Sequence, residues 1–340
     1  MKPRRILFYL TVIVLLLAVY SGWMLFGPTV KVPPSGFFYI HTGSSYGQVQ
    51  DSLRKYNVFG AGFWFDRVAR YVGYDHDVRP GRYRIARGMS TIDLVRMLRS
   101  GRQAPVNLVI TKLRTREDLA RKIGDDFETD SAAASRFLNS NDSLSSFGVD
   151  TNTVLTIVIP DTYTYLWNTP VSAILKKLAA GRNRFWDETR RQEAEALQLT
   201  PDQVYILASI VEEETNRNED KGKIASVYLN RLNRHMKLAA DPTIKFAMKD
   251  FALKRIYYKY LSYPSPYNTY LHEGLPPGPI NTPSIRTLDA VLQEPRTDYL
   301  FFVARPNSGG LSDFSSSFRE HEQFAKAYRD ALDSAAAQKR

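Results

Sequence analysis

The sequence predicts an α+β protein with a single N-terminal transmembrane helix and a helix-rich C-terminal half. Three observations carry this prediction: an uncharged run of 21 residues near the N-terminus, short β-rich segments among amphipathic helices up to residue 111, and a strongly capped helix starting at residue 201. Apolar residues make up 44% and charged residues 24% of the 340, which is globular composition. The length suffices for two domains beside an anchor.

Charge and residue types narrow the possible chemistry. The 46 Lys and Arg residues exceed the 35 Asp and Glu residues by 11, which indicates an anionic partner such as nucleic acid, a membrane surface or an acidic polymer. The chain has no cysteine, so disulfides, thiolate metal sites and cysteine nucleophiles are excluded. Its five histidines show no metal-ligand spacing, and no nucleophile-elbow, Walker or Rossmann pattern is present. We therefore predict neither a metal nor a cofactor.

The N-terminus predicts a membrane anchor. Lys2, Arg4 and Arg5 precede the uncharged run 6–26, which spans roughly 32 Å as a helix and so matches the bilayer core. A cleaved signal peptide is the alternative, but its apolar region is usually about 7–15 residues and ends at a small-residue site, which is missing here. The basic residues place 1–5 in the cytoplasm and the rest outside, at the periplasmic side of the inner (plasma) membrane. Nucleic acid is therefore excluded as a partner.

The segment behind the anchor predicts a small module. Residues 27–36 form a linker that contains VPPSG, and composition predicts the order strand, helix, helix, strand, followed by a helix that Ser90 caps. The expected ranges are 37–42, 46–56, 63–72, 82–86 and 91–99. A further strand is expected at 106–111. Between 115 and 195 the pattern is weaker, and 171–197 fits either one long charged helix or a helix pair.

The clearest helix begins after Thr200, where Pro201 takes the first helical position and Gln203 completes a capping box. Leu207, Ile210, Val211 and Glu214 follow at offsets 0, 3, 4 and 7, so Glu214 continues the apolar face toward the core.

Glu213 and Glu212 lie about 100° and 160° from Glu214 around the helix axis, so the three carboxylates face different surroundings. Partial burial and the helix dipole are expected to raise the pKa of Glu214, as a general acid requires. A solvated helix end is the alternative for this acidic run.

Two features follow this helix. A second helix is expected from Asp220, and a short third one from Pro242 with Asp241 as its N-cap. The proline-stiffened loops 264–270 and 274–280 then carry Tyr and Asn side chains, which suit binding of sugar rings.

Taken together, these segments resemble the endolytic murein transglycosylase, or YceG-like, family. The order and spacing of five motifs match: ASIVEEET (208–215), VYLNRL (227–232), ADPTIKF (240–246), YNTY (267–270) and GLPPGPI (274–280). The resemblance implies a LysM-like module at 37–104 and a YceG-like catalytic domain with a helix-rich core at 105–335.

The resemblance also implies a membrane-anchored enzyme that cleaves the MurNAc-β-1,4-GlcNAc bond inside nascent peptidoglycan strands. The product would carry a 1,6-anhydroMurNAc end, which terminates strand elongation. Implied partners are the glycan strands, the lipid bilayer and the cell-wall synthesis machinery. The motif match places the catalytic carboxyl on Glu214. Supporting or substrate-binding roles fall on Glu212, Asn230, Arg231, Asp241, Thr243, Tyr267, Asn268 and Tyr270.

A single carboxyl suffices for this reaction. The C6 hydroxyl of the muramic sugar replaces water as nucleophile, so one residue can first protonate the leaving oxygen and then deprotonate that hydroxyl. Two alternatives stay open. A non-catalytic glycan-binding scaffold would not depend on Glu214, and a hydrolytic muramidase would need a second essential carboxylate and would leave reducing ends.

Overall fold

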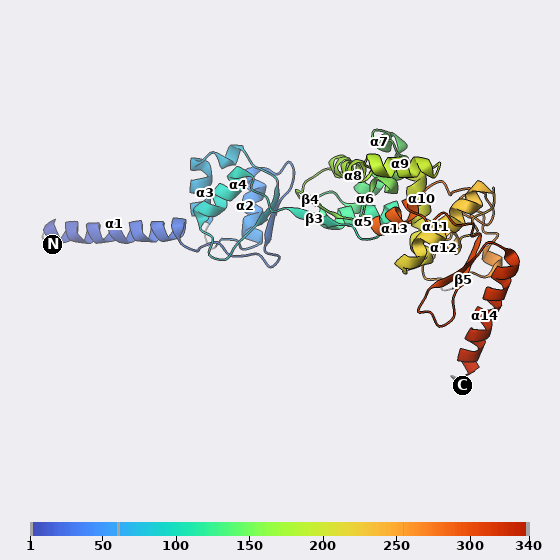
Figure 1. The fold of residues 1–340 in the computed structure, drawn as a ribbon. Helices are drawn as coiled ribbons and strands as arrows, with labels where there is room; N and C mark the ends of the chain where they lie inside the picture. The colour runs from blue at the N-terminus through green and yellow to red at the C-terminus, as the bar shows by residue number, and fades with distance from the viewer. Residues whose placement is uncertain (1–2, 60–61, 254, 338–340) are drawn as a thin grey trace. The chain divides into compact units, whose positions relative to one another are not determined.

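The structure is a computed structural model that describes residues 3–59, 62–253 and 255–337 (Figure 1). The described residues fall into two compact units, and each is described by itself. The first is drawn from Met1–Asn107, Asp126–Thr129 and Thr164–Pro170. The second is drawn from Leu108–Asp125, Asp130–Tyr163 and Val171–Arg340.

The first unit opens with the helix α1 (Pro3–Phe26), which is long and apolar enough to cross a membrane. Behind it, β1 (Phe37–Ile40) pairs antiparallel with β2 (Gly81–Arg84), with Phe38 opposite Tyr83. The remaining elements of this unit are α2 (Tyr46–Lys55), α3 (Gly62–Tyr71), the 3-10 turn η1 (Tyr74–His76) and α4 (Thr91–Ser100).

Local sequence explains these elements. Ser45 and Ser90 each close a capping box, with Gln48 and Asp93 respectively, so α2 and α4 begin where the sequence predicts. The apolar faces of the helices and strands meet in one core, whose largest buried members are Phe38, Leu53, Phe65, Tyr74, Tyr83, Leu94 and Leu98. The order strand, helix, helix, strand is confirmed, with element ends within two residues of the expected ranges. The likeness of this module to LysM stays a prediction.

The second unit begins at Leu108, within the strand β3 (Val106–Val109), which forms a two-stranded sheet with β4 (Thr162–Tyr165). Its first helical elements are α5 (Arg116–Asp126), α6 (Ser131–Leu138), α7 (Asn141–Ser145), η2 (Val154–Ile157), α8 (Val171–Phe185) and α9 (Glu188–Ala196). Of the two interpretations of 171–197, the helix pair is correct. Asp187 separates the helices, because its carboxylate caps α9 by accepting from the Arg190 N–H at 3.0 Å.

The core of the second unit surrounds α10 (Pro201–Glu214), which Thr200 and Gln203 cap as predicted. Every residue of α10 from Val204 to Val211 is buried, so this helix is apolar on all sides rather than on one stripe. It contacts the helices α11 (Asn218–Asn233), α12 (Asp241–Ala247) and α13 (Ile285–Leu292). The last elements are η3 (Tyr258–Tyr260), the antiparallel strands β5 (Phe301–Ala304) and β6 (Ser312–Ser315), and α14 (Phe318–Ala337).

One predicted cap is wrong. Ala240, not Asp241, is the N-cap of α12, and Asp241 is already helical. The Asp241 carboxylate instead accepts a hydrogen bond from the Tyr270 hydroxyl at 2.6 Å. The Tyr270 hydroxyl, from the loop after α12, therefore donates to the Asp241 carboxylate in place of a backbone N–H at the start of α12.

Candidate active site

The three consecutive glutamates at the end of α10 face three different environments, as helix geometry predicts. Glu212 accepts hydrogen bonds from Lys221 at 3.1 Å, from Ser284 at 3.0 Å and from Thr287. Glu213 forms an ion pair with Lys112 at 2.6 Å. Of the three glutamates, Glu214 is the one for which the described part of the chain supplies no cation at ion-pair distance.

Glu214 is half-buried at the last position of α10. Its Oε1 atom accepts a hydrogen bond from the hydroxyl of Tyr228 at 2.6 Å. Tyr228 lies on α11, is 1% exposed, and has its ring edge-on to Phe302 at 6.0 Å. The Tyr228 ring cannot move away without opening the core, so it fixes the orientation of the Glu214 carboxyl.

Burial raises the pKa of the Glu214 carboxyl from its ordinary value of 4.5 to about 7. The negative charge of Asp241 raises the pKa as well. The hydrogen bond from Tyr228 and the positive charges of Lys245 and Arg231 act in the opposite direction without cancelling the effect of burial. A large fraction of Glu214 is therefore protonated at neutral pH, as a general acid must be.

Arg231 and the pair of Asp241 and Tyr270 are the charged and polar surroundings of Glu214. The Arg231 guanidinium is anchored, because it donates to the carbonyls of Leu238 at 2.6 Å and Leu300 at 2.8 Å. Burial lowers the pKa of Arg231. Burial and the bond to Asp241 both raise the pKa of Tyr270, so its hydroxyl stays a hydrogen-bond donor at neutral pH. Asp241 itself is exposed.

Three further predicted site residues have their polar groups engaged inside the protein. The Asn230 amide donates to the carbonyls of Thr297 at 2.7 Å and Tyr299 at 2.9 Å, and so secures the segment before β5. Asn268 is fully buried, and its amide donates to two loop carbonyls and accepts from the Tyr270 N–H. Thr243 is also fully buried and shares a hydrogen bond of 2.9 Å with Thr269. These bonds shape the loops around Glu214, and they leave the buried Asn268 amide and Thr243 hydroxyl little to offer a sugar.

Glu212 connects helices on the side of α10 away from Glu214. Burial alone would raise the pKa of Glu212, but the hydrogen bonds from Thr287 and Lys221 outweigh burial and lower it. The Lys221 side chain is only 6% exposed, and its ammonium also donates to Thr287 at 2.6 Å. Glu212 is thus half of a largely buried ion pair that joins α10, α11 and α13.

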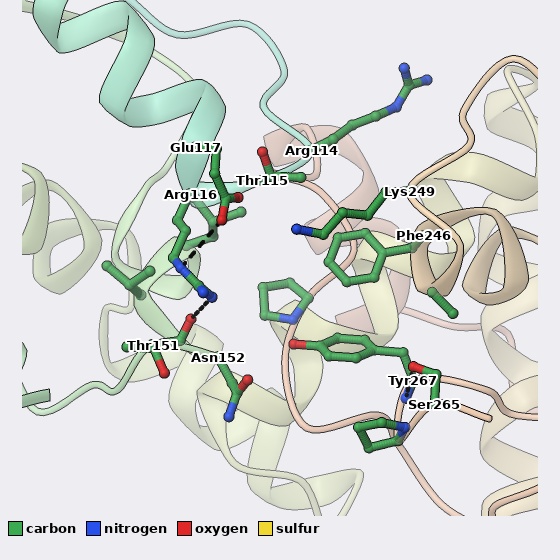
Figure 2. A pocket seen from close by; sticks show the side chains of 15 residues that line it. Arg114, Thr115, Arg116, Glu117, Thr151, Asn152, Phe246, Lys249, Ser265 and Tyr267 are labelled. Atoms are coloured by element: carbon green, nitrogen blue, oxygen red, sulfur yellow. Dashed lines mark hydrogen bonds and ion pairs between the residues drawn. The ribbon is translucent and has the colours of Figure 1, made fainter. Parts of the chain in front are cut away.

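Tyr267 lies apart from this group, in a cavity of about 310 Å³ that it lines with Phe246 (Figure 2). The two rings contact at a centroid distance of 4.7 Å. The structure therefore brings together Glu214, Arg231, Asp241 and Tyr270, while Tyr267 belongs to a neighbouring pocket. Among the described residues, no group of three His, Cys, Asp or Glu side chains is placed to hold a metal ion.

Sequence reasoning missed two residues that act on Glu214. Tyr228 lies three positions before Arg231, so helical spacing places both on one face of α11, but an apolar stripe gave no sign that its hydroxyl reaches α10. Lys245 lies four positions after Asp241, which places both on one face of α12. The shared face with Asp241 was the sequence signal that could have indicated that Lys245 lies near the site.

The comparison with known families agrees with these motifs. The YceG-like family model matches residues 38–327. The chain belongs to the YceG-like family. The resemblance read from the five motifs is thereby confirmed.

Three similar proteins extend this finding. A protein of Bacillus subtilis (strain 168) named endolytic murein transglycosylase is 28% identical over 308 residues, covering 85% of this chain and 83% of that protein. A Streptococcus pneumoniae (strain D39) protein of the same name is 26% identical and is covered over 56% of its length. A crystal structure of a yceG-like protein from Listeria monocytogenes aligns with a TM-score of 0.56 and 27% identity, covering 84% of this chain and 98% of that one.

Proposed function

We propose that this chain is an endolytic lytic transglycosylase that cleaves the MurNAc-β-1,4-GlcNAc bond within nascent peptidoglycan strands. The observation that supports this most directly is Glu214: a half-buried carboxyl with a pKa of about 7, held by Tyr228 at the end of α10. Membership of the YceG-like family and the names of the similar proteins supply the substrate class.

The chemistry needs one carboxyl. Protonated Glu214 gives its proton to the glycosidic oxygen as the bond between that oxygen and C1 of MurNAc breaks. The C6 hydroxyl of the same sugar then bonds to C1 and returns its proton to Glu214. The product is a 1,6-anhydroMurNAc end, no water is consumed, and the strand can no longer be elongated from that end.

The surroundings of Glu214 suit this double role. The Tyr228 hydroxyl stabilises the carboxylate that exists between the two proton transfers, since hydrogen bonds to an ionised acceptor are the stronger ones. Asp241 and Tyr270 are on the accessible side of the site, so we assign them to sugar hydroxyls. The positive charge of Arg231 stabilises the ionised Glu214 carboxylate. Asn230, Thr243, Asn268 and Glu212 keep structural roles.

The location is also part of the proposal. We assign α1 to a membrane, with residues 1–5 in the cytoplasm and the rest of the chain on the periplasmic side. The module at 37–104 would bind glycan as a LysM-like domain, next to the cell-wall synthesis machinery that makes the strands. The net charge of +11 favours this environment, because stem peptides and lipid headgroups are anionic.

Product analysis tests the proposal. The full chain in detergent and its Glu214→Gln variant are incubated with uncrosslinked glycan strands, and the fragment ends are identified by mass spectrometry. Anhydro ends from the parent alone are expected. Reducing ends would instead identify a hydrolytic muramidase, in which Asp241 is the nearby candidate for the second carboxylate. Intact strands with retained glycan binding would identify a scaffold.

A further inference from the structure

The cavity that Tyr267 lines has the features of a second binding site in the same unit. Its volume is about 310 Å³, and it opens between the start of α5, the 151–155 segment, the end of α12 and the two proline-rich loops. Phe246, Tyr267, Pro266 and Pro279 supply an apolar wall. Figure 2 shows the Tyr267 hydroxyl and the Lys249 ammonium pointing into the same space.

Lys249 is the uncommitted cation of this pocket. The Arg116 guanidinium donates to Asn139 at 2.7 Å and to the Thr151 carbonyl at 2.8 Å, and it pairs with Glu117 at 3.6 Å. Arg114 points away from the cavity (Figure 2). Within the part of the chain that the structure describes, the Lys249 ammonium takes part in no hydrogen bond or ion pair, and no dashed line reaches it in Figure 2. Its charge is available to a ligand.

Lys249 ends α12 in a Schellman motif, because its N–H donates to the Phe246 carbonyl at 3.0 Å and the Asp250 N–H donates to the Lys245 carbonyl at 3.0 Å. The φ of Lys249 is +52°, the left-handed region that glycine and asparagine adopt easily and lysine does not. The position follows the end of α12, where glycine is the usual residue. From this position the exposed Lys249 side chain extends along the cavity (Figure 2).

The ligand must therefore carry a negative charge beside an apolar portion. Phe246 and Tyr267 present adjacent faces, and burial raises the pKa of Tyr267 to about 12, so its hydroxyl is a neutral donor. A carboxylate between Lys249 and that hydroxyl, followed by small apolar side chains along the wall, fills these features. An isolated inorganic anion would leave the wall unused.

The pocket is close to Glu214 without including it. Lys245, whose charge lowers the pKa of Glu214, directly precedes Phe246 on α12. Asp241, whose charge raises that pKa, lies about 8 Å from Phe246 along the helix axis. Glu213, the neighbour of Glu214, pairs with Arg114 on the rim at 3.7 Å. The helix α12 therefore contributes to both places, with Asp241 near Glu214 and Phe246 in the wall of the pocket.

We propose that this pocket binds the terminal carboxylate and alanine side chains of the stem peptide carried by a muramic sugar. The inference rests on the proposed function, which supplies a peptide-bearing glycan as substrate. The pocket would favour strands whose peptides end in a free carboxylate, as uncrosslinked peptides do.

A binding experiment with the full chain in nanodiscs tests the assignment. The probes are an N-acetylmuramoyl pentapeptide ending in D-alanyl-D-alanine, the same compound with a terminal carboxamide, and acetate. Titration calorimetry should show about fivefold weaker binding of the acid probe to Lys249→Asn, which is about 1 kcal/mol. Binding of the amide probe should not change. Asparagine tolerates a positive φ, so the variant should fold with an unchanged or higher unfolding temperature.

Arg296→Asn is the matched control. Arg296 is exposed, also has a positive φ of 49°, and does not line the pocket, so the variant removes the same charge from the same backbone conformation. Equal affinity of the acid and amide probes, equal losses in both variants, or complete competition by acetate would overturn the inference. Anhydro products from a protein that fails this test would leave the proposed function intact. Lys249-dependent binding without strand cleavage would support the pocket assignment and contradict the proposed function.

Discussion

Replacing Tyr228 by phenylalanine isolates the hydrogen bond that holds the Glu214 carboxyl. The substitution removes the hydroxyl that donates to Oε1 at 2.6 Å and keeps the ring against Phe302. That bond lowers the pKa of Glu214, so its loss must raise the pKa above the value of about 7. The general acid should then stay protonated to higher pH.

The size of the shift follows from the strength of the bond. A hydrogen bond to a charged group contributes roughly 1.5–3 kcal/mol, and one pKa unit corresponds to about 1.36 kcal/mol. The neutral carboxyl also accepts from Tyr228, so only the difference between the two protonation states counts. We expect an upward shift of about one unit.

The assay is the pH dependence of kcat/KM for release of anhydro ends from glycan strands, which reports the pKa of the free enzyme. The alkaline limb of Tyr228→Phe should move to higher pH by about one unit. Tyr205→Phe is the control, because Tyr205 is equally buried but donates to the Val158 carbonyl at 2.6 Å. An unmoved limb, or one displaced to lower pH, would refute the assignment of this limb to Glu214.

Three more predictions concern the acidic residues. Asp241→Asn removes a negative charge that raises the pKa of Glu214, so the alkaline limb should move to lower pH; loss of cleavage at every pH would instead make Asp241 a second catalytic carboxylate. The raised pKa of Glu214 stabilises the fold fully below pH 4.5, and that stability is lost as pH rises through 7. The free energy of unfolding in urea, taken as Glu214→Gln minus parent, should therefore rise by up to about 3 kcal/mol between pH 4 and pH 8. A difference that stays constant over this pH range would contradict the burial argument. Glu212→Gln leaves Lys221 buried without its carboxylate and should lower the free energy of unfolding by about 3 kcal/mol, while the pH midpoint of cleavage stays in place.

The local elements were predictable because their signals are local. A cap and its partner are three residues apart, so Ser90 and Thr200 located the starts of α4 and α10 from sequence spacing alone. The capping box at Ser45 has the same spacing, but only the structure identified it. Helical period also separated Glu214 from Glu213 and Glu212. Asp241 shows the limit, since its predicted role as a cap gave way to Tyr270, 29 residues further along the chain.

The sequence by itself determined an apolar N-terminal helix, the order of elements in the first unit, the family, and the carboxyl that continues the apolar face of α10. The tertiary structure decided which polar groups surround that carboxyl. Tyr228, Arg231 and Asp241 reach Glu214 from other helices, whereas Asn230, Asn268 and Thr243 turn inward to loop carbonyls and hydroxyls. A polar side chain has several partners within reach in a folded chain, and only the packing of distant segments selects among them.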